Sequence, residues 1–166
     1  MQIFRLLKHI LSGPWRVHLA FPIPSLKAIE EAITASETSH LGEIRFVVEA
    51  ALDFGDLLQG ITPRQRAIDV FSQYRVWDTE HNTGVLIYLL LADRDVEIVA
   101  DRGIHDRVGD AVWAQICRHM EAQFRVGQFK SGVIDGIAQI TVELQQHFPA
   151  SASENPNEIS NAPLLL

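Results

Sequence analysis

Residues 76–106 read VWDTEHNTGVLIYLLLADRDVEIVADRGIHD, and this stretch decides the fold. Residues 85–91 form a continuous apolar run, which predicts a central strand that is covered on both faces. Residues 92–95 are typical of a tight turn, and residues 96–101 alternate between apolar and more polar side chains, so we expect an antiparallel return strand. Such a hairpin brings the segment before its first strand beside the segment after its second.

Acidic and histidine side chains lie in both of these flanking segments. The candidate metal ligands are Asp78, Glu80, Asp101 and Asp106, joined by Glu43 from the start of an earlier strand. Calcium and magnesium take several carboxylate and carbonyl oxygens from adaptable loops, so these residues predict a divalent cation site. Further candidates nearby are His40, His81, Asn82, Arg102 and His105. A solvated acidic rim without a metal is the alternative, because the sequence contains no EF-hand, HExxH, Walker or GxGxxG pattern.

The same loops could also carry acid–base chemistry. His81 or His105 beside a carboxylate could move a proton, and Arg102 could hold a phosphate through two hydrogen bonds. No serine or cysteine stands in a recognisable nucleophile motif, so a phosphatase would need metal-bound water. A rival site lies at the opposite end of the sheet, where open α/β sheets commonly bind ligands. It would contain Glu49, Asp53, Asp93, Arg94 and Asp95, although a turn alone also explains the last three.

Residues upstream of the hairpin complete a βαβ unit. Residues 43–49 alternate and predict a strand, while Thr62 and Pro63 are typical of a helix start. A strand–helix–strand crossover makes the two strands parallel. Apolar stripes over 108–124 and 129–148 predict two more helices. We therefore predict an α/β fold with a central mixed β-sheet, formed by a βαβ unit plus a β-hairpin and sandwiched between helices.

The 166 residues are enough for one domain with a substantial core. We expect an N-terminal segment over 1–22, a single α/β domain over 23–149 that opens with a helix capped by Ser25, and a disordered tail over 150–166. The net charge of −7 argues against a nucleic acid partner. Cys117 is the single cysteine, and its apolar helical setting predicts a buried thiol.

The N-terminal segment has an amphipathic pattern. Phe4, Leu7 and Leu11 share one helical face, with Arg5 and Lys8 close by, which favours docking on a membrane surface or a partner. Basic residues interrupt the apolar run, so the segment is a poor secretory signal, and no stretch reaches the ~20 apolar residues that span a bilayer. We expect a cytoplasmic protein, with a peripheral position at the inner membrane face as the alternative.

From about residue 40 to residue 149 the chain resembles the TPM domain family. The matching stretches are 81–104, HNTGVLIYLLLADRDVEIVADRGI, then the helix that reaches Met120, then 124–136, FRVGQFKSGVIDG. The resemblance implies an α/β sandwich, calcium binding, an acid phosphatase activity in some plant members, and membrane-tethered relatives.

These observations favour a noncatalytic binding or accessory module. It would hold calcium or magnesium at the acidic loops, use no organic cofactor, and assist membrane protein assemblies through an unknown protein partner. The alternative is a metal-dependent, acid-phosphatase-like hydrolase.

Overall fold

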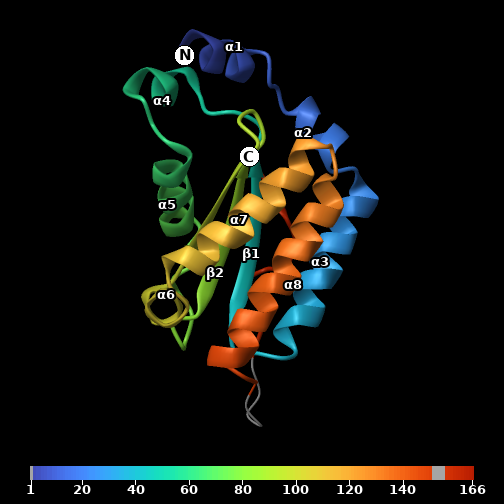
Figure 1. The fold of residues 1–166 in the computed structure, drawn as a ribbon, viewed down its shortest axis with the longest axis vertical. Coiled ribbons are helices and arrows are strands. Elements are labelled where there is room, and N and C mark those ends of the chain that lie inside the picture. Colours follow the sequence, from blue (N-terminus) through green and yellow to red (C-terminus); the bar gives the residue numbers. More distant parts are fainter. Residues whose placement is uncertain (1, 151–155) are drawn as a thin grey trace.

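The structure is a computed structural model that describes residues 2–150 and 156–166. Within these residues, eight helices and four strands form a layered α/β fold (Figure 1). In chain order the elements are α1 (Gln2–Ile10), α2 (Trp15–Ala20), α3 (Ile23–Glu37), β1 (Glu43–Glu49), α4 (Phe54–Gln59), α5 (Pro63–Gln73), β2 (Gly84–Leu90), β3 (Asp95–Ala100), α6 (Arg102–Val108), α7 (Asp110–Arg125), α8 (Phe129–His147) and β4 (Leu164–Leu165).

The four strands form one mixed sheet in the order β3-β2-β1-β4. β1 and β2 are parallel, with register from Glu43 opposite Gly84 to Glu49 opposite Leu90. β2 and β3 form the antiparallel hairpin. The predicted βαβ unit, hairpin and mixed sheet are therefore confirmed, and α5 begins at Pro63 with Thr62 and Gln65 forming a reciprocal capping box.

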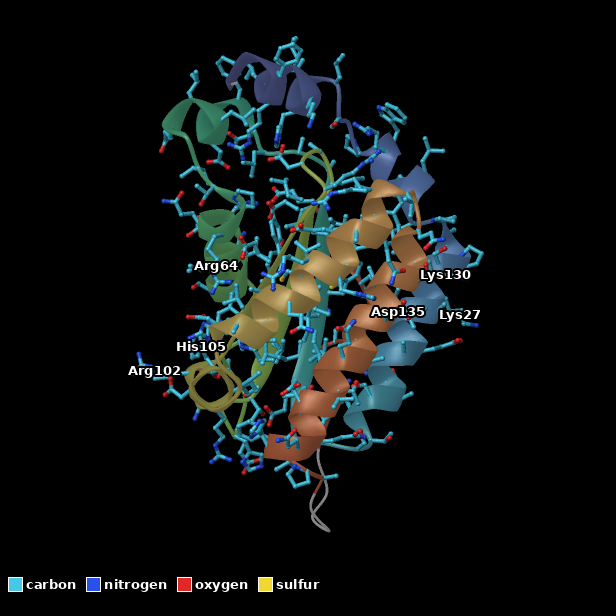
Figure 2. All side chains as sticks on the ribbon, viewed as in Figure 1. Lys27, Arg64, Arg102, His105, Lys130 and Asp135 are labelled. Carbon is cyan, nitrogen blue, oxygen red and sulfur yellow. The ribbon has the colours of Figure 1, made fainter. Side chains whose placement is uncertain are left out.

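Helices cover both faces of the sheet. The crossover helix α5 lies on one face, and α3, α7 and α8 lie on the other (Figure 1). At one end, where β1 and β2 finish, α1, α2 and α4 gather. At the other end lies α6, which carries Arg102 and His105 (Figure 2). The sheet is thus sandwiched between helices, as predicted.

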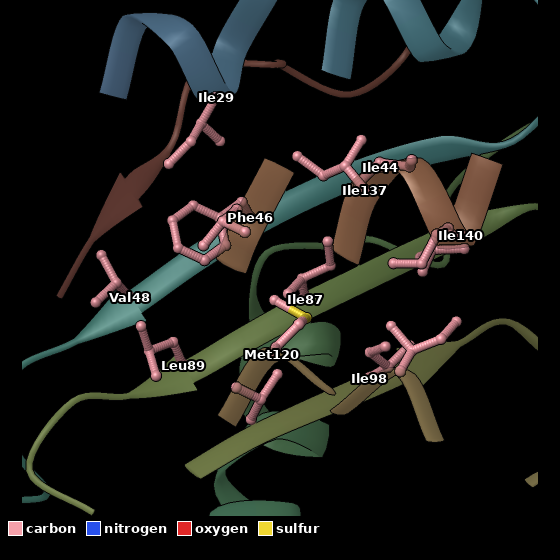
Figure 3. Packing of buried hydrophobic residues seen from close by; sticks show 14 of the residues in the cluster. Ile29, Ile44, Phe46, Val48, Ile87, Leu89, Ile98, Met120, Ile137 and Ile140 are labelled. Atoms are coloured by element: carbon pink, nitrogen blue, oxygen red, sulfur yellow. The ribbon is translucent and has the colours of Figure 1, made fainter. Parts of the chain in front are cut away.

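Successive side chains along each strand point to opposite faces of the sheet, so the core consists of two clusters, one on each face. The larger cluster lies between the sheet and α3, α7 and α8; Figure 3 shows part of it, including Ile29, Phe46, Val48, Ile87, Leu89, Ile98, Met120, Ile137 and Ile140. The smaller cluster lies under α5 and includes Val47, Leu86, Tyr88 and Leu90. Because β2 contributes to both clusters, it reads as a continuous apolar run rather than an alternating one.

A buried polar network ties α5 to the sheet within the smaller cluster. Arg66 donates from Nε and Nη2 to the two carboxylate oxygens of Glu49, at 2.9 Å each. The hydroxyl of Tyr88 donates to Glu49 Oε2 at 2.5 Å. Burial, together with the charge of Glu49, raises the pKa of Tyr88, so the phenol remains protonated and keeps donating.

Two sequence expectations need correction. The first domain helix begins at Ile23, directly after Pro22, and its N-cap is not Ser25. Pro24 fits inside the first turn because backbone N–H groups there have no partner within the helix. Residues 102–108, expected as part of a loop, form the short helix α6. The apolar period of so short a helix is too brief to recognise from sequence.

The predicted disordered tail over 150–166 is wrong for residues 156–166, whereas 151–155 lie outside the described residues. Leu164 and Leu165 pair in parallel with Val47 and Val48 of β1 and form β4. Arg45 donates to the carbonyls of Ser160 and Ala162. Polar composition predicted disorder, but main-chain pairing and the side chains of β1 hold this segment on the sheet.

Gly84 provides a test of how the loop before β2 is packed. A Cβ atom at this position would lie 1.8 Å from the carbonyl oxygen of Val76, a buried residue. We expect Gly84→Ala to lower the free energy of unfolding by about 3 kcal/mol or more, because the backbone would have to shift. Urea denaturation measures this change.

Gly55→Ala in α4 is the matched control, because the nearest atom to its added Cβ is Asp53 Oδ1 at 3.2 Å. Its free energy of unfolding should change by about 1 kcal/mol or less. Equal stability of the two variants would contradict the close packing of Val76 on the start of β2.

Candidate functional site

The two segments that flank the hairpin meet at one end of the sheet. The N–H of Asp101 donates to the carbonyl of Gly84 at 2.9 Å, which extends the hairpin pairing beyond the strands. The carbonyl oxygen of Asn82 lies 3.2 Å from the position that a Cβ of Gly103 would take. The predicted meeting of these segments is therefore present in the structure.

These segments enclose a surface cavity, here called the hairpin-edge cavity. Its volume is about 650 Å³. It is lined by Phe71, His81, Asn82, Ala100, Asp101, Arg102, Gly103 and Asp106. Five of the predicted site residues therefore share one cavity, and they supply two carboxylates, an imidazole, a guanidinium and an amide.

Asp101 occupies a special position in this cavity. It caps the N-terminus of α6, and its Oδ1 accepts from the N–H of Arg102 at 2.7 Å. Its other carboxylate oxygen, Oδ2, is buried and has no hydrogen-bond partner among the described residues. A buried carboxylate oxygen without a partner is costly, so a cation or an external donor at this place would relieve the cost.

His105 does not line the hairpin-edge cavity. Its Nε2 lies 3.4 Å from Asp110 Oδ1, at the start of α7. The difference follows from α6 being a helix, because successive side chains on a helix point in different directions around its axis. Arg102 and Asp106 line the cavity, whereas His105 lies between them in sequence and pairs elsewhere.

Asp78 and Glu80 also lie outside the lining of this cavity. Asp78 pairs with Arg75, with Oδ2 3.9 Å from Nη1, and its side chain is largely exposed. The backbone N–H of Glu80 donates to the carboxylate of Glu158 in the C-terminal segment. This loop therefore contributes His81 and Asn82 to the cavity.

Glu43 is covered by the C-terminal segment. Its Oε2 accepts from the N–H groups of Glu158 and Ile159, at 3.3 and 3.1 Å. Burial raises the pKa of Glu43, and the two backbone donors oppose that rise. Glu43 thus has a structural role that the sequence did not reveal, because the C-terminal segment was expected to be disordered.

His40 is buried and acts as a structural link. Its Nε2 lies 2.7 Å from Ser36 Oγ, and its Nδ1 accepts from the N–H of Gly42 at 3.1 Å. Burial lowers its pKa to about 4, so the imidazole is neutral near pH 7. Within residues 2–150 and 156–166, no three His, Cys, Asp or Glu side chains are grouped so that they could hold a metal ion by themselves.

The rival residues at the opposite end of the sheet are mostly used by the fold. Glu49 belongs to the buried network with α5, described above. Asp53 caps α4 by accepting from the N–H of Asp56 at 2.8 Å, and Asp93 pairs with Arg5 at 2.9 Å. Asp95 differs from these residues, because it lines a separate cavity.

This second cavity, here called the β3-edge cavity, has a volume of about 380 Å³. Its charged or polar lining residues are Arg64, Asp95, Glu97, Asp110, Trp113, Cys117, Arg118 and Glu121. The sequence pointed to Asp95 but not to its neighbours, since they come from α5, β3 and α7 and share no sequence motif. Burial raises the pKa of Cys117 to about 12, so the thiol is not an activated nucleophile.

Comparison with known proteins agrees with the fold. Residues 24–143 match the family model of the TPM domain. The NMR structure of the BA42 protein from the psychrophilic bacterium Bizionia argentinensis is similar, with a TM-score of 0.77 and 32% sequence identity over 87% of this chain and 94% of that chain. Curated proteins gave no match. Because the family model spans well over half of the sequence, the chain belongs to the TPM domain family.

Proposed function

We propose that the chain is a noncatalytic accessory module that docks on an anionic lipid surface, where it would assist membrane protein assemblies. The observation that carries this proposal is a gathering of exposed apolar side chains, here called the apolar pole. Among the described residues, nine of the fourteen exposed large hydrophobic side chains belong to it. They are Phe4, Leu7, Ile10, Leu11, Trp15, Leu19, Ile23, Phe54 and Leu58.

The apolar pole is built by α1, α2, α4 and the start of α3 at one end of the molecule (Figure 1). Polar contacts hold α1 there: Arg5 donates to the carbonyl of Ile61 at 3.2 Å, and His9 Nδ1 accepts from the N–H of Leu52 at 3.0 Å. With those side chains directed at the domain, Phe4 and Leu11 remain 77% and 70% exposed. Exposed apolar surface of this extent is typical of interaction sites on soluble domains.

The charge around the apolar pole supports an anionic surface as the partner. Lys8 is exposed on α1, and α1 and α2 contain no acidic residue, while the whole chain has a net charge of −7. Basic side chains near an anionic bilayer contribute about 1 kcal/mol each. An amphipathic surface with basic residues would lie in the interface between lipid and water. No helix in residues 2–150 or 156–166 has the length and apolar character needed to cross a bilayer.

Vesicle binding tests this proposal. We expect the full chain to co-sediment with vesicles that contain phosphatidylglycerol, and the variant Phe4→Ser/Leu11→Ser to lose at least about tenfold in partition coefficient, because each inserted side chain contributes about 1.5 kcal/mol or more. Lys8→Glu should weaken binding to anionic vesicles only. Both variants change only exposed side chains, so their circular dichroism spectra should match that of the unmodified chain.

Val142→Ser is the matched control, because Val142 is exposed on α8 and lies outside the apolar pole. It should bind vesicles as the unmodified chain does. Full vesicle binding by the Phe4/Leu11 variant, or no binding by the unmodified chain, would exclude the apolar pole as a lipid-binding surface.

A second candidate function is divalent cation binding at the hairpin-edge cavity. It is favoured by Asp101 Oδ2, which has no hydrogen-bond partner in the part of the chain that the structure describes, and by Asp106 on the same lining. Calcium accepts mixtures of carboxylate, carbonyl and water oxygens, so the carbonyl of Asn82 and bound water would complete the set. Such a mixed and partly hydrated site is expected to be weak.

Calcium titration followed by NMR tests the cation site. We expect millimolar calcium to shift the amide signals of residues 81–82 and 101–106, and Asp101→Asn/Asp106→Asn to abolish these shifts, because it removes the anionic oxygens. Asp69→Asn, on the exposed surface of α5, should leave them unchanged. Signals that stay in place at millimolar calcium would remove this candidate.

A metal-dependent phosphatase is the enzymatic alternative, since His81 and Arg102 line the same cavity as the two carboxylates. Arg102 could hold a phosphate, and His81 could protonate a leaving group. Under the accessory-module proposal, we expect no hydrolysis of para-nitrophenyl phosphate above the buffer rate, with or without calcium, magnesium or manganese.

Hydrolysis that disappears in Asp101→Asn/Asp106→Asn would establish the enzymatic alternative instead. Hydrolysis that survives in a triple variant that also carries Asp78→Asn would exclude these carboxylates as the active site.

A further inference from the structure

The β3-edge cavity lies beside an edge of the sheet and belongs to neither the apolar pole nor the hairpin-edge cavity. Among the described residues β3 pairs with β2 alone, so it is an edge strand, and side chains cover it so that Val96 and Ile98 are only 3% and 2% exposed. The N–H of Asp101 donates to the carbonyl of Gly84 in β2. Because backbone groups alternate in direction along an antiparallel pair, those of residues 95, 97 and 99 also point toward β2. The N–H and carbonyl groups of Val96, Ile98 and Ala100 therefore point away from the sheet.

Side chains from both flanking helices bond to the outward backbone groups of this edge. Arg64 of α5 donates to the carbonyl of Ile98 at 2.6 Å. From α7, the carboxylate of Glu121 accepts from the N–H of Val96, with Oε1 3.5 Å from the nitrogen. Edge strands present unpaired backbone groups that can accept a further strand. Here, side chains already bond to some of these backbone groups.

Negative charge is concentrated along this edge. Asp95, Glu97, Asp110 and Glu121 line the cavity, against the two guanidinium groups of Arg64 and Arg118. Burial, together with the neighbouring Glu97 and Glu121, raises the pKa of Asp95 to about 7. The same causes act on Glu97, although Arg64 opposes them. The carboxylates are thus poorly compensated, and an added cation would stabilise their charged forms.

Two polar atoms of the cavity lining are buried and have no hydrogen-bond partner within residues 2–150 and 156–166. Asp95 Oδ1 is an acceptor, and Trp113 Nε1 is a donor on a side chain that is only 4% exposed. Leaving such groups unpaired is costly. A complementary ligand would therefore bring a donor, preferably a cationic one, together with an acceptor.

We propose that the β3 edge binds an extended segment of a partner protein, which adds to the sheet as a fifth strand and places a lysine or arginine side chain in the β3-edge cavity. A peptide backbone carries both donors and acceptors, which can replace the side-chain partners of Val96 and Ile98, and strand addition is an established way of recognising peptides. The basic side chain would meet Asp95 and Glu121. A bare metal ion fits less well, because it would leave the donor Trp113 Nε1 without a partner.

Arg64 acts as the residue that the incoming segment displaces. It lies on α5 (Figure 2). Its side chain is 43% exposed. Besides the carbonyl of Ile98 it has a second partner, Glu97 Oε2, at 3.4 Å. The guanidinium can therefore leave the carbonyl and keep an ionic contact, which frees the backbone acceptor for a strand.

The test uses the full chain and a synthetic peptide in which lysine alternates with threonine or valine. NMR of the isotope-labelled chain should show shifts at the amides of Val96, Ile98 and Ala100, with slower hydrogen exchange at Ile98. A peptide with glutamate in place of lysine should not bind. Two further peptides carry N-methyl groups on alternate residues in opposite phase, and only the phase that leaves the donors facing β3 intact should retain binding.

Variants of the chain distinguish the contribution of side-chain charge to peptide binding from that of backbone pairing. Glu121→Gln and Glu97→Gln should each weaken peptide binding by up to roughly fivefold, the size of a partly exposed ion pair. Arg64→Ala should tighten binding, because it removes a competing cation and frees the carbonyl of Ile98. Glu30→Gln and Arg75→Ala, at exposed positions on other parts of the chain, are the matched controls and should have no effect.

Several results would overturn the proposal. No binding at millimolar peptide would exclude this edge as a docking site. If the two N-methylated peptides bound equally well, or if lysine amide bound as tightly as the full peptide, the cavity would bind amines without strand addition. An equal effect of Glu30→Gln would indicate nonspecific attraction to an acidic protein. Vesicle binding through the apolar pole is measured separately, so it stands or falls independently.

Discussion

β1 and β2 lie parallel along seven residue pairs, and this pairing constrains the rest of the molecule. Parallel neighbours cannot be joined by a tight turn, so the chain must cross one face of the sheet through α4 and α5. That crossover covers one face and leaves the other to α3, α7 and α8, which buries β2 on both faces. Arg66 and Tyr88 both donate to Glu49 and so join α5, β1 and β2 through one buried carboxylate.

The same pairing places the polar hairpin-edge cavity and the apolar pole at opposite ends of the sheet. Because β1 and β2 run in one direction, their starting ends and the end of β3 meet at one end of the sheet, where Asp101, Asp106, His81 and Arg102 gather around a cavity. Their finishing ends lie at the other end, where α1, α2 and α4 carry the apolar pole. A module with this arrangement can rest its apolar end on a surface while the polar end faces water.

Much of the fold could be predicted from residues 76–106, because a buried strand, a tight turn and an alternating strand each have a local signature. The meeting of the loops around Asn82 and Asp101 followed from the hairpin alone. Local patterns could not show that residues 102–108 form a helix, which turns His105 toward Asp110, nor that Glu43 binds the backbone of residues 158–159. The first feature is a helix too short to show an apolar period, and the second is a contact between distant parts of the chain, as is the group around Asp95.

The two edges of the sheet differ in whether a further strand is added, and this difference bears on how the protein recognises partners. At the β1 edge, the chain's own C-terminal segment adds as β4, and Glu43 and Arg45 bind its backbone N–H and carbonyl groups. Charged side chains beside an edge strand thus already hold an extended segment in this molecule. At the β3 edge, Arg64 and Glu121 instead bind backbone groups of the edge strand itself, at Ile98 and Val96, and none of the described segments pairs with it. A strand from outside the domain would therefore have to replace these side-chain contacts with its own backbone groups, as the proposed displacement of Arg64 requires.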